Sequence, residues 1–205
     1  MDRYQIKKEA KEFVKDNIWN IWKALLVNLI VSFLYTFLFA YVIKDSTSLL
    51  YNVLSLAYNL VTIPLMFGIS RYLLKLLRKE EYNFSDLFYY YKHNVLEAII
   101  VSFIISILTS LGIVLFLFPA IYVAILFSQS SNLFVDGYNK VQDNLKTCIE
   151  IMKNYKWDYF NFLISFLGWL ILGIMSFGIL LIWVLPYMMM AQKIYYEKLK
   201  KEKNL

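Results

Sequence analysis

Residues 95–135 read VLEAIIVSFIISILTSLGIVLFLFPAIYVAILFSQSSNLFV, and this run sets the class of the protein. Its 41 residues carry one charge, Glu97, close to the start. As a single α-helix the run would be about 61 Å long, about twice the thickness of the hydrocarbon core of a bilayer. It must therefore fold back. Ser110-Leu111-Gly112 is the predicted turn, because glycine tolerates turn conformations.

Apolar runs of similar character lie on both sides of this one. The run 160–192 has no charge and is also too long for one crossing, with a predicted turn at Ser176-Phe177-Gly178. We therefore expect an all-α integral membrane protein, a single domain with six transmembrane helices arranged as three hairpins. The predicted spans are about 18–43, 49–70, 95–110, 113–134, 160–175 and 178–195.

The placement of Lys and Arg predicts the orientation, because these residues favour the cytoplasmic side. With six spans, 20 of the 21 Lys and Arg residues fall on one side, and only Lys44 falls on the other. A four-span interpretation would place Lys140, Lys146, Lys153 and Lys156 outside. The sequence thus favours six spans with both termini cytoplasmic. The abundance of Lys, Asn, Ile and Tyr hints at an AT-rich bacterial genome, and the expected location is a bacterial cytoplasmic membrane.

The composition fits this class and argues against another. Hydrophobic residues make up 60% of the chain, against about 45–50% in an average soluble domain. The net charge of +6 lies beside the apolar runs. There it sets orientation and attracts anionic lipid at the cytoplasmic face, so no nucleic-acid partner is expected. Cys148 is the only cysteine, which excludes an internal disulfide.

Three stretches outside the spans have the pattern of amphipathic helices, at about 3–16, 83–92 and 138–155. The first places Ile6, Ala10 and Val14 on one face. We expect all three to lie in the cytoplasmic headgroup layer of the bilayer. Packing on a partner protein, either another membrane protein or a second copy, is the competing interpretation.

Each pair of spans has a proline in its returning helix, at Pro64, Pro119 and Pro186. Proline inside a membrane helix frees a backbone carbonyl and kinks the helix. Three kinked helices could frame a cavity, or the kinks could serve packing alone. The pattern suggests three hairpin repeats, with chance similarity among apolar helices as the alternative.

No catalytic constellation, metal-ligand spacing or phosphate-binding loop is visible, so no cofactor is expected. An intramembrane enzyme would need polar groups such as His93, Glu97 or Asp158 to converge near the interface. Two polar stripes at helical spacing fit either helix packing or a polar pathway. They consist of Asn52, Ser55, Asn59 and Thr62 on the second span, and Ser102, Ser106 and Thr109 on the third.

The last third of the chain carries Ser165-Phe166-Leu167-Gly168-Trp169, then Pro186-Tyr187, then Tyr195-Tyr196. With these motifs the chain resembles a family of bacterial integral membrane proteins known as domain of unknown function 975. Phe118-Pro119-Ala120-Ile121 is similar to the Pro-Gly-Ile element of that family, although Ala120 replaces its usual glycine, which puts a close backbone approach there in doubt. The segment 144–156 is similar to its cytoplasmic helix. The resemblance implies a multi-pass membrane protein and brings no known activity.

Three functional hypotheses remain open. The first is a non-enzymatic membrane protein, either a transport-related component or a scaffold that acts through other membrane proteins. The second is a transporter of small molecules or lipids, with a cavity framed by the proline-containing helices. The third, and the least favoured, is an intramembrane enzyme.

Overall fold

The computed structural model describes residues 2–41, 49–115 and 117–205, and every regular element in these ranges is a helix. The elements are α1 (Arg3–Tyr41), α2 (Leu49–Arg78), the 3₁₀ helix η1 (Phe84–Tyr91), α3 (Val95–Leu115), α4 (Leu117–Leu126), α5 (Ser130–Val135), α6 (Val141–Met152), α7 (Lys156–Ile164), α8 (Leu167–Met175) and α9 (Leu181–Glu202). The predicted turn at Lys44 lies outside these residues.

Within the described residues, five helical segments are long and apolar enough to cross a membrane. They are Arg3–Tyr41, Leu49–Arg78, Val95–Leu115, Leu117–Val135 and Lys156–Met175. The predicted sixth span, 178–195, corresponds to α9, which is not among them. The apolar part of α9 ends at Ala191, because Gln192 and Lys193 follow. From Leu181 that part is only about 16 Å long.

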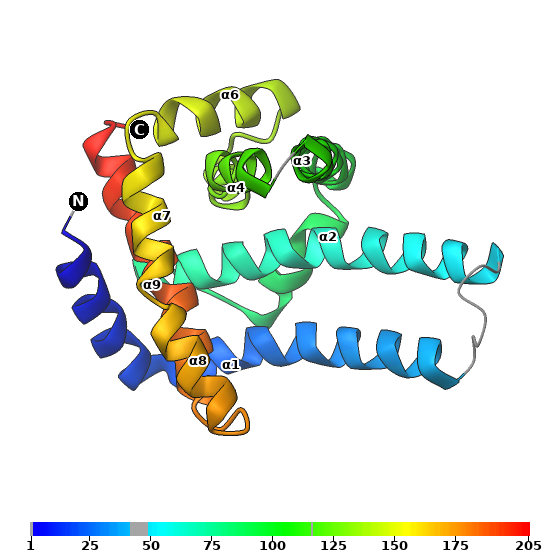
Figure 1. Cartoon of the computed structure of the whole chain (residues 1–205), viewed down its shortest axis with the longest axis horizontal. Coiled ribbons are helices and arrows are strands. Elements are labelled where there is room, and N and C mark those ends of the chain that lie inside the picture. The colour runs from blue at the N-terminus through cyan, green and yellow to red at the C-terminus, as the bar shows by residue number, and fades with distance from the viewer. Residues whose placement is uncertain (1, 42–48, 116) are drawn as a thin grey trace.

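Figure 1 shows three arms that extend from a common base in different directions. The first arm is the side-by-side pair of α1 and α2, and the second is the pair of α3 and α4, which the view shows end-on. The third arm is the end of α8 and the start of α9. The base combines the N-terminal part of α1, the C-terminal halves of α2 and α9, and the short helices η1, α5 and α6.

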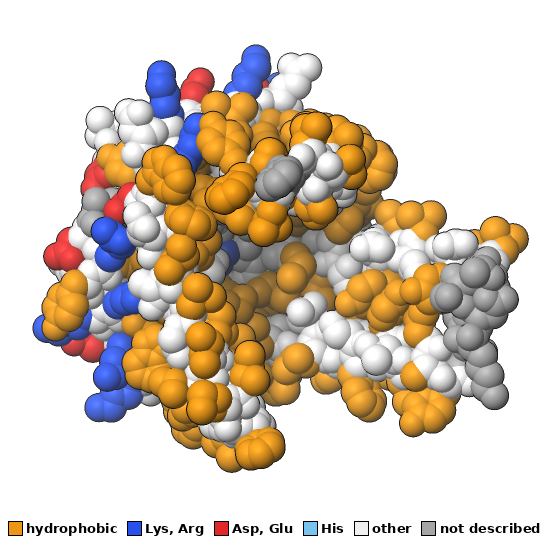
Figure 2. Space-filling model, in the orientation of Figure 1, with side chains coloured by type: hydrophobic (Ala, Val, Ile, Leu, Met, Phe, Trp, Pro, Cys, Tyr) orange, Lys and Arg blue, Asp and Glu red, His pale blue; other side chains and the backbone are white. Residues whose placement is uncertain are grey.

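Charge and apolar surface are separated between base and arms. In Figure 2 the Lys, Arg, Asp and Glu side chains gather over the base, whereas the visible surface of the arms is largely apolar. Val114 at the end of α3 is 83% exposed and Ile174 at the end of α8 is 73% exposed. A water-soluble chain would bury such residues, so the arms have the surface expected of membrane-inserted helices.

The predicted turn at Ser110-Leu111-Gly112 is wrong, because α3 continues to Leu115. Gly112 serves helix packing instead. A Cβ atom there would lie 2.7 Å from the backbone of Ala120, so the missing side chain lets α3 and α4 approach closely. The backbones of α3 and α4 therefore do approach closely at Ala120, although the family's usual glycine is missing there. Because α4 begins at Leu117, Pro119 lies in its first helical turn, where proline costs little.

The predicted helices 3–16 and 18–43 form one continuous helix, α1. Ile6 and Ala10 are fully buried in the base instead of facing lipid. The predicted helix 138–155 shortens to α6, and its Cys148 and Met152 are buried in the same cluster. The apolar faces of both helices thus pack on the rest of the chain, which corrects the expectation that they face the bilayer.

Other boundaries divide between agreement and correction. The predicted turn at 176–178 is confirmed: α8 ends at Met175, and Phe177 and Gly178 have φ values of 52° and 87°. The predicted helix 83–92 is present as η1. The predicted spans 113–134 and 160–175 are each broken, the first between α4 and α5 and the second between α7 and α8.

Candidate functional site

A small pocket with a mixed polar and apolar lining lies where α1, α2 and α3 meet, with a volume of about 260 Å³. Its polar lining comes from all three helices: Asn28, Ser32, Tyr58, Thr62 and Ser102. The Ser32 and Tyr58 hydroxyls are 3.1 Å apart, and the Thr62 hydroxyl donates to the carbonyl of Tyr58 at 2.9 Å. The structure therefore brings one residue from each predicted polar stripe, Thr62 and Ser102, to the same pocket.

The remaining stripe residues do not line this pocket. Asn59 donates to the carbonyl of Ser55 at 2.8 Å, and Thr109 donates to the carbonyl of Ile105 at 2.8 Å. These bonds within single helices satisfy polar groups locally, as membrane helices require. Ser55 also lies 3.3 Å from the Tyr35 hydroxyl, while Asn52 and Ser106 are exposed on the arms. Two prolines lie beyond the first turn of their helices: Pro64 follows Thr62 and Ile63 of the pocket wall, and Pro186 is buried in α9.

A buried amide network connects α2, α5, α6 and α9 in the base. Lys193 donates to the hydroxyl of Ser70 at 2.8 Å and also to the side-chain oxygen of Asn132. Ser130 donates to the Asn144 side chain at 2.6 Å. Lys193 is 7% exposed and forms no ion pair with any acid in the described part of the chain. Neutral oxygens therefore hold this buried amine.

An ionic network centred on Asp136 lies beside the amide network. Its carboxylate, 6% exposed, accepts from Arg78 at 2.7 and 3.0 Å, and from Tyr196 and Lys200 at 2.7 Å each. Arg78 also contacts Glu197 at 2.6 Å. Burial alone would raise the pKa of Asp136, but the hydrogen bonds from Arg78, Lys200 and Tyr196 outweigh it, so this pKa lies below its usual value. Asp136 therefore remains a carboxylate at neutral pH.

A second carboxylate fixes η1 to α2. Asp86 accepts from Arg71 at 3.0 Å and from Lys75 at 2.9 Å, and also from the backbone N–H of Asn83. Burial would raise the pKa of Asp86, but these three donors lower it below its usual value. The two helices are in close contact, because a Cβ atom on Gly68 would lie 1.9 Å from the carbonyl oxygen of Leu87. The packed helices η1 and α2 therefore form a structural part of the base.

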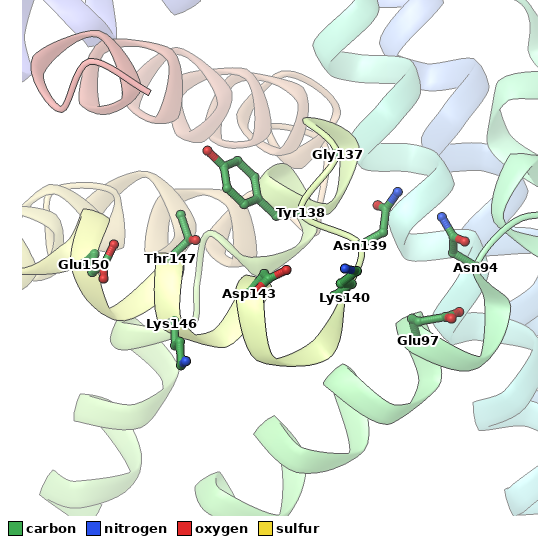
Figure 3. A pocket seen from close by; sticks show the side chains of 10 residues that line it. All are labelled: Asn94, Glu97, Gly137, Tyr138, Asn139, Lys140, Asp143, Lys146, Thr147 and Glu150. Carbon is green, nitrogen blue, oxygen red and sulfur yellow. The ribbon is translucent and has the colours of Figure 1, made fainter.

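A surface depression of about 700 Å³ lies between the start of α3 and the segment 137–150 (Figure 3). Figure 3 shows Asn94 and Glu97 on the α3 side, and the other labelled side chains come from residues 137–150. Its acids, Glu97, Asp143 and Glu150, alternate with Lys140 and Lys146. Such mixed charge on an open surface is typical of a solvated face.

The groups that an intramembrane enzyme would need have separate partners. His93 stacks on Tyr89 with ring centroids 4.2 Å apart, and Asp158 accepts from Tyr195 at 2.9 Å. Glu97 lies in the depression of Figure 3. In the described residues no cluster of three or more His, Cys, Asp or Glu side chains could hold a metal ion. These contacts assemble no acid–base pair.

The motif residues of the last third gather where α1 meets α7, α8 and α9. Ser165 and Phe166 form the break between α7 and α8, and Lys7 donates to the carbonyl of Ser165 at 3.1 Å. Phe166 is fully buried, and its ring contacts that of Tyr187 at 5.2 Å. Trp169 and Tyr187 line an apolar groove beside α1.

The last part of the chain matches a known protein family. Residues 113–203 match the family described as "Protein of unknown function (DUF975)". The match confirms the resemblance inferred from the motifs. No curated protein and no solved structure matches the chain. The DUF975 segment contributes α9 and the centres of both buried networks, Asp136 and Lys193. Gly168 of its motif has no neighbour within 4 Å of an added Cβ, so packing does not explain that glycine.

The buried networks were missed by sequence reasoning. Residues 128–132, Ser-Gln-Ser-Ser-Asn, form a polar run inside the predicted fourth span, 113–134. This run supplies Gln129, Ser130 and Asn132 to the base, and it is the signal that could have located the network.

Proposed function

We propose that this chain is a non-enzymatic multi-pass membrane protein, either a transport-related component or a scaffold that acts through other membrane proteins. One observation carries the proposal: the arms diverge from the base and leave large apolar surfaces without partners inside the chain. Phe33, on the first arm, is 69% exposed, and Phe103, on the second, is 63% exposed. Lipid and the helices of other membrane proteins are the natural partners of such surfaces.

The proposed topology has both termini on the cytoplasmic side of a bacterial membrane, with anionic lipid at that face and no nucleic-acid partner. The contact between Glu9 and Lys198, at 2.8 Å, supports one side for both termini and hence an even number of crossings. Six crossings result if α9 completes the set. The alternative is four crossings, in which α7, α8 and α9 enter only part of the bilayer. The Trp22 indole donates to the carbonyl of Ile182 at 2.9 Å. Trp22 lies near the cytoplasmic end of the first predicted span, whereas Ile182 would lie near the outer end of a sixth span. Their contact therefore favours the alternative of four crossings.

Thiol labelling separates the two topologies. Phe177 is 98% exposed at the tip of the α8–α9 turn. In a Cys148→Ser background, Phe177→Cys should react with an impermeant maleimide added outside whole cells if there are six crossings. Ser46→Cys, in the predicted first outer turn, is the positive control for both topologies. Labelling of position 46 but not of position 177 from outside would reject six crossings.

Site-specific photo-cross-linking tests the scaffold. Benzoylphenylalanine placed at Phe33 or Phe103 should give discrete adducts with one identifiable membrane protein, or with a second copy of the chain. Trp157, which is 76% exposed at the start of α7, is the matched control away from these two arms. If both arm positions gave lipid adducts only, the scaffold proposal would be rejected.

A second candidate, a transporter of small molecules or lipids, is supported by the pocket at Thr62 and Ser102. If water reaches this pocket, Ser102→Cys in the Cys148→Ser background should react with a charged methanethiosulfonate. Phe103→Cys, the neighbouring position that faces away with 63% exposure, should stay unreactive in lipid. Equal inertness at both positions would indicate a dry contact and remove the support for transport.

A further inference from the structure

An apolar groove runs between the N-terminal part of α1 and the α8–α9 pair, with a volume of about 430 Å³. This volume lies within the range of about 300–1,000 Å³ typical of small-molecule sites. Its apolar walls consist of Val14, Ile18, Trp169, Trp183, Val184 and Tyr187. Both tryptophans are about half-exposed, at 49% for Trp169 and 55% for Trp183, so they present ring surface that the chain itself leaves uncovered.

Two cations border this groove. Lys11 and Lys15 line it and are four residues apart on α1, so they lie on the same helix face. Both are exposed, and neither forms an ion pair in the described part of the chain. Lys7, one turn earlier, is held by the Ser165 carbonyl and lies over the Phe166 ring at 4.6 Å. Of these three cations on α1, the two without a partner are thus the ones that line the groove.

We propose that this groove binds an anionic phospholipid, with an acyl chain against the two tryptophans and the phosphate against Lys11 and Lys15. Apolar walls with a cationic border match the two ends of such a molecule. Free phosphate would leave the apolar walls uncovered. A partner helix would need acidic residues opposite both lysines, whereas anionic lipid is already present around a membrane protein. The site goes beyond the proposed function and would serve a scaffold or a transporter equally.

The test uses the full chain in detergent micelles with phospholipids whose acyl chains are brominated, because bromine quenches tryptophan fluorescence on contact. Brominated phosphatidylglycerol should quench saturably at low mole fraction, and brominated phosphatidylcholine much less. The selective quenching should disappear in the variant W169F/W183F. Each basic residue near anionic lipid contributes about 1 kcal/mol, or about fivefold in affinity. K11Q/K15Q should therefore bind phosphatidylglycerol about 25-fold more weakly.

The variant K140Q/K146Q is the matched control, because it removes two exposed lysines from the depression of Figure 3. It should bind phosphatidylglycerol like the unmodified chain. Equal quenching by the two lipids, or an unchanged preference in K11Q/K15Q, would overturn the proposal. Relief of quenching by soluble glycerol phosphate would assign the cations to phosphate alone. A photo-cross-linker at position 183 that captured a protein in cells would assign the groove to a partner helix. Either result rejects the lipid site and leaves the arm experiments unaffected.

Discussion

The substitution Asp136→Asn should destabilise the base strongly, because it removes the one negative charge that Arg78, Lys200 and Tyr196 share. Arg78 keeps Glu197 at 2.6 Å, but the described part of the chain offers Lys200 no second acid. Breaking a buried ion pair on one side costs about 3–5 kcal/mol. For a chain of this size each kcal/mol lowers the melting temperature by about 2–4 °C. We therefore expect a decrease of about 6–20 °C.

The chain contains its own reporter for this measurement. Cys148 is the only cysteine and is fully buried in α6. Burial raises the pKa of its thiol to about 12, so little reactive thiolate forms in the folded protein. A maleimide dye that fluoresces on reaction will therefore label Cys148 only as the base unfolds, and its signal during heating gives the melting temperature.

Asp143→Asn is the matched control, because it makes the same chemical change at an exposed position on α6. Its melting temperature should stay within about 2 °C of the unmodified chain, as for most surface substitutions. If Asp136→Asn also melted within about 2 °C of the unmodified chain, the ionic network would not stabilise the base. Circular dichroism before heating verifies that both variants start folded.

Four further predictions concern helix packing and the stability of the base. Gly68→Ala should destabilise by about 1–3 kcal/mol or more, because its Cβ would meet the Leu87 carbonyl at 1.9 Å. Gly168→Ala, with no neighbour within 4 Å, should be neutral or stabilising by up to about 1 kcal/mol in the same melting assay. The pKa of Asp136 lies below its ordinary value of 3.8 in the folded protein, so its ionised carboxylate stabilises the fold at pH values above about 3.8. Melting temperatures should therefore fall as the pH drops below about 4, less steeply in Asp136→Asn. Native Cys148 should resist maleimide at pH 7 and react fully in denaturant, and rapid native labelling would contradict its burial.

The arms follow from the sequence because lipid-facing helices need only length and apolarity. The run 95–135 had to fold back on length alone, and it does so. The position of the turn could not be predicted from glycine as a turn residue. Gly112 serves the contact with Ala120 instead, and α3 continues past it to Leu115. A glycine in an apolar run can therefore mark a close helix approach as well as a turn.

The base was harder to predict, because its residues are ordinary in sequence and unusual only in their contacts. Lys193 and Ser70 are 123 residues apart, and Arg78 and Asp136 are 58 apart. Periodicity within one helix carries no information about such pairs. The sequence correctly predicts an apolar face on each of the helices 3–16 and 138–155, but a hydrophobic face does not show whether lipid or protein covers it. In this chain the protein covers both.

The cations that predicted the orientation of the chain divide into two groups in the structure. Arg71, Lys75, Arg78 and Lys200 are bound to Asp86 or Asp136. Most of their charge is offset within the base by Asp86, Asp136 and Glu197, so they stabilise the fold and contribute less to lipid binding than unpaired lysines do. The rule that Lys and Arg favour the cytoplasmic side counts these four residues equally with Lys11 and Lys15. Lys11 and Lys15, however, form no ion pair within the described residues and border an apolar groove. The attraction to anionic lipid that the net charge of +6 implies is therefore concentrated on the unpaired lysines. Among these, the two beside an apolar groove are the ones placed to hold a single lipid.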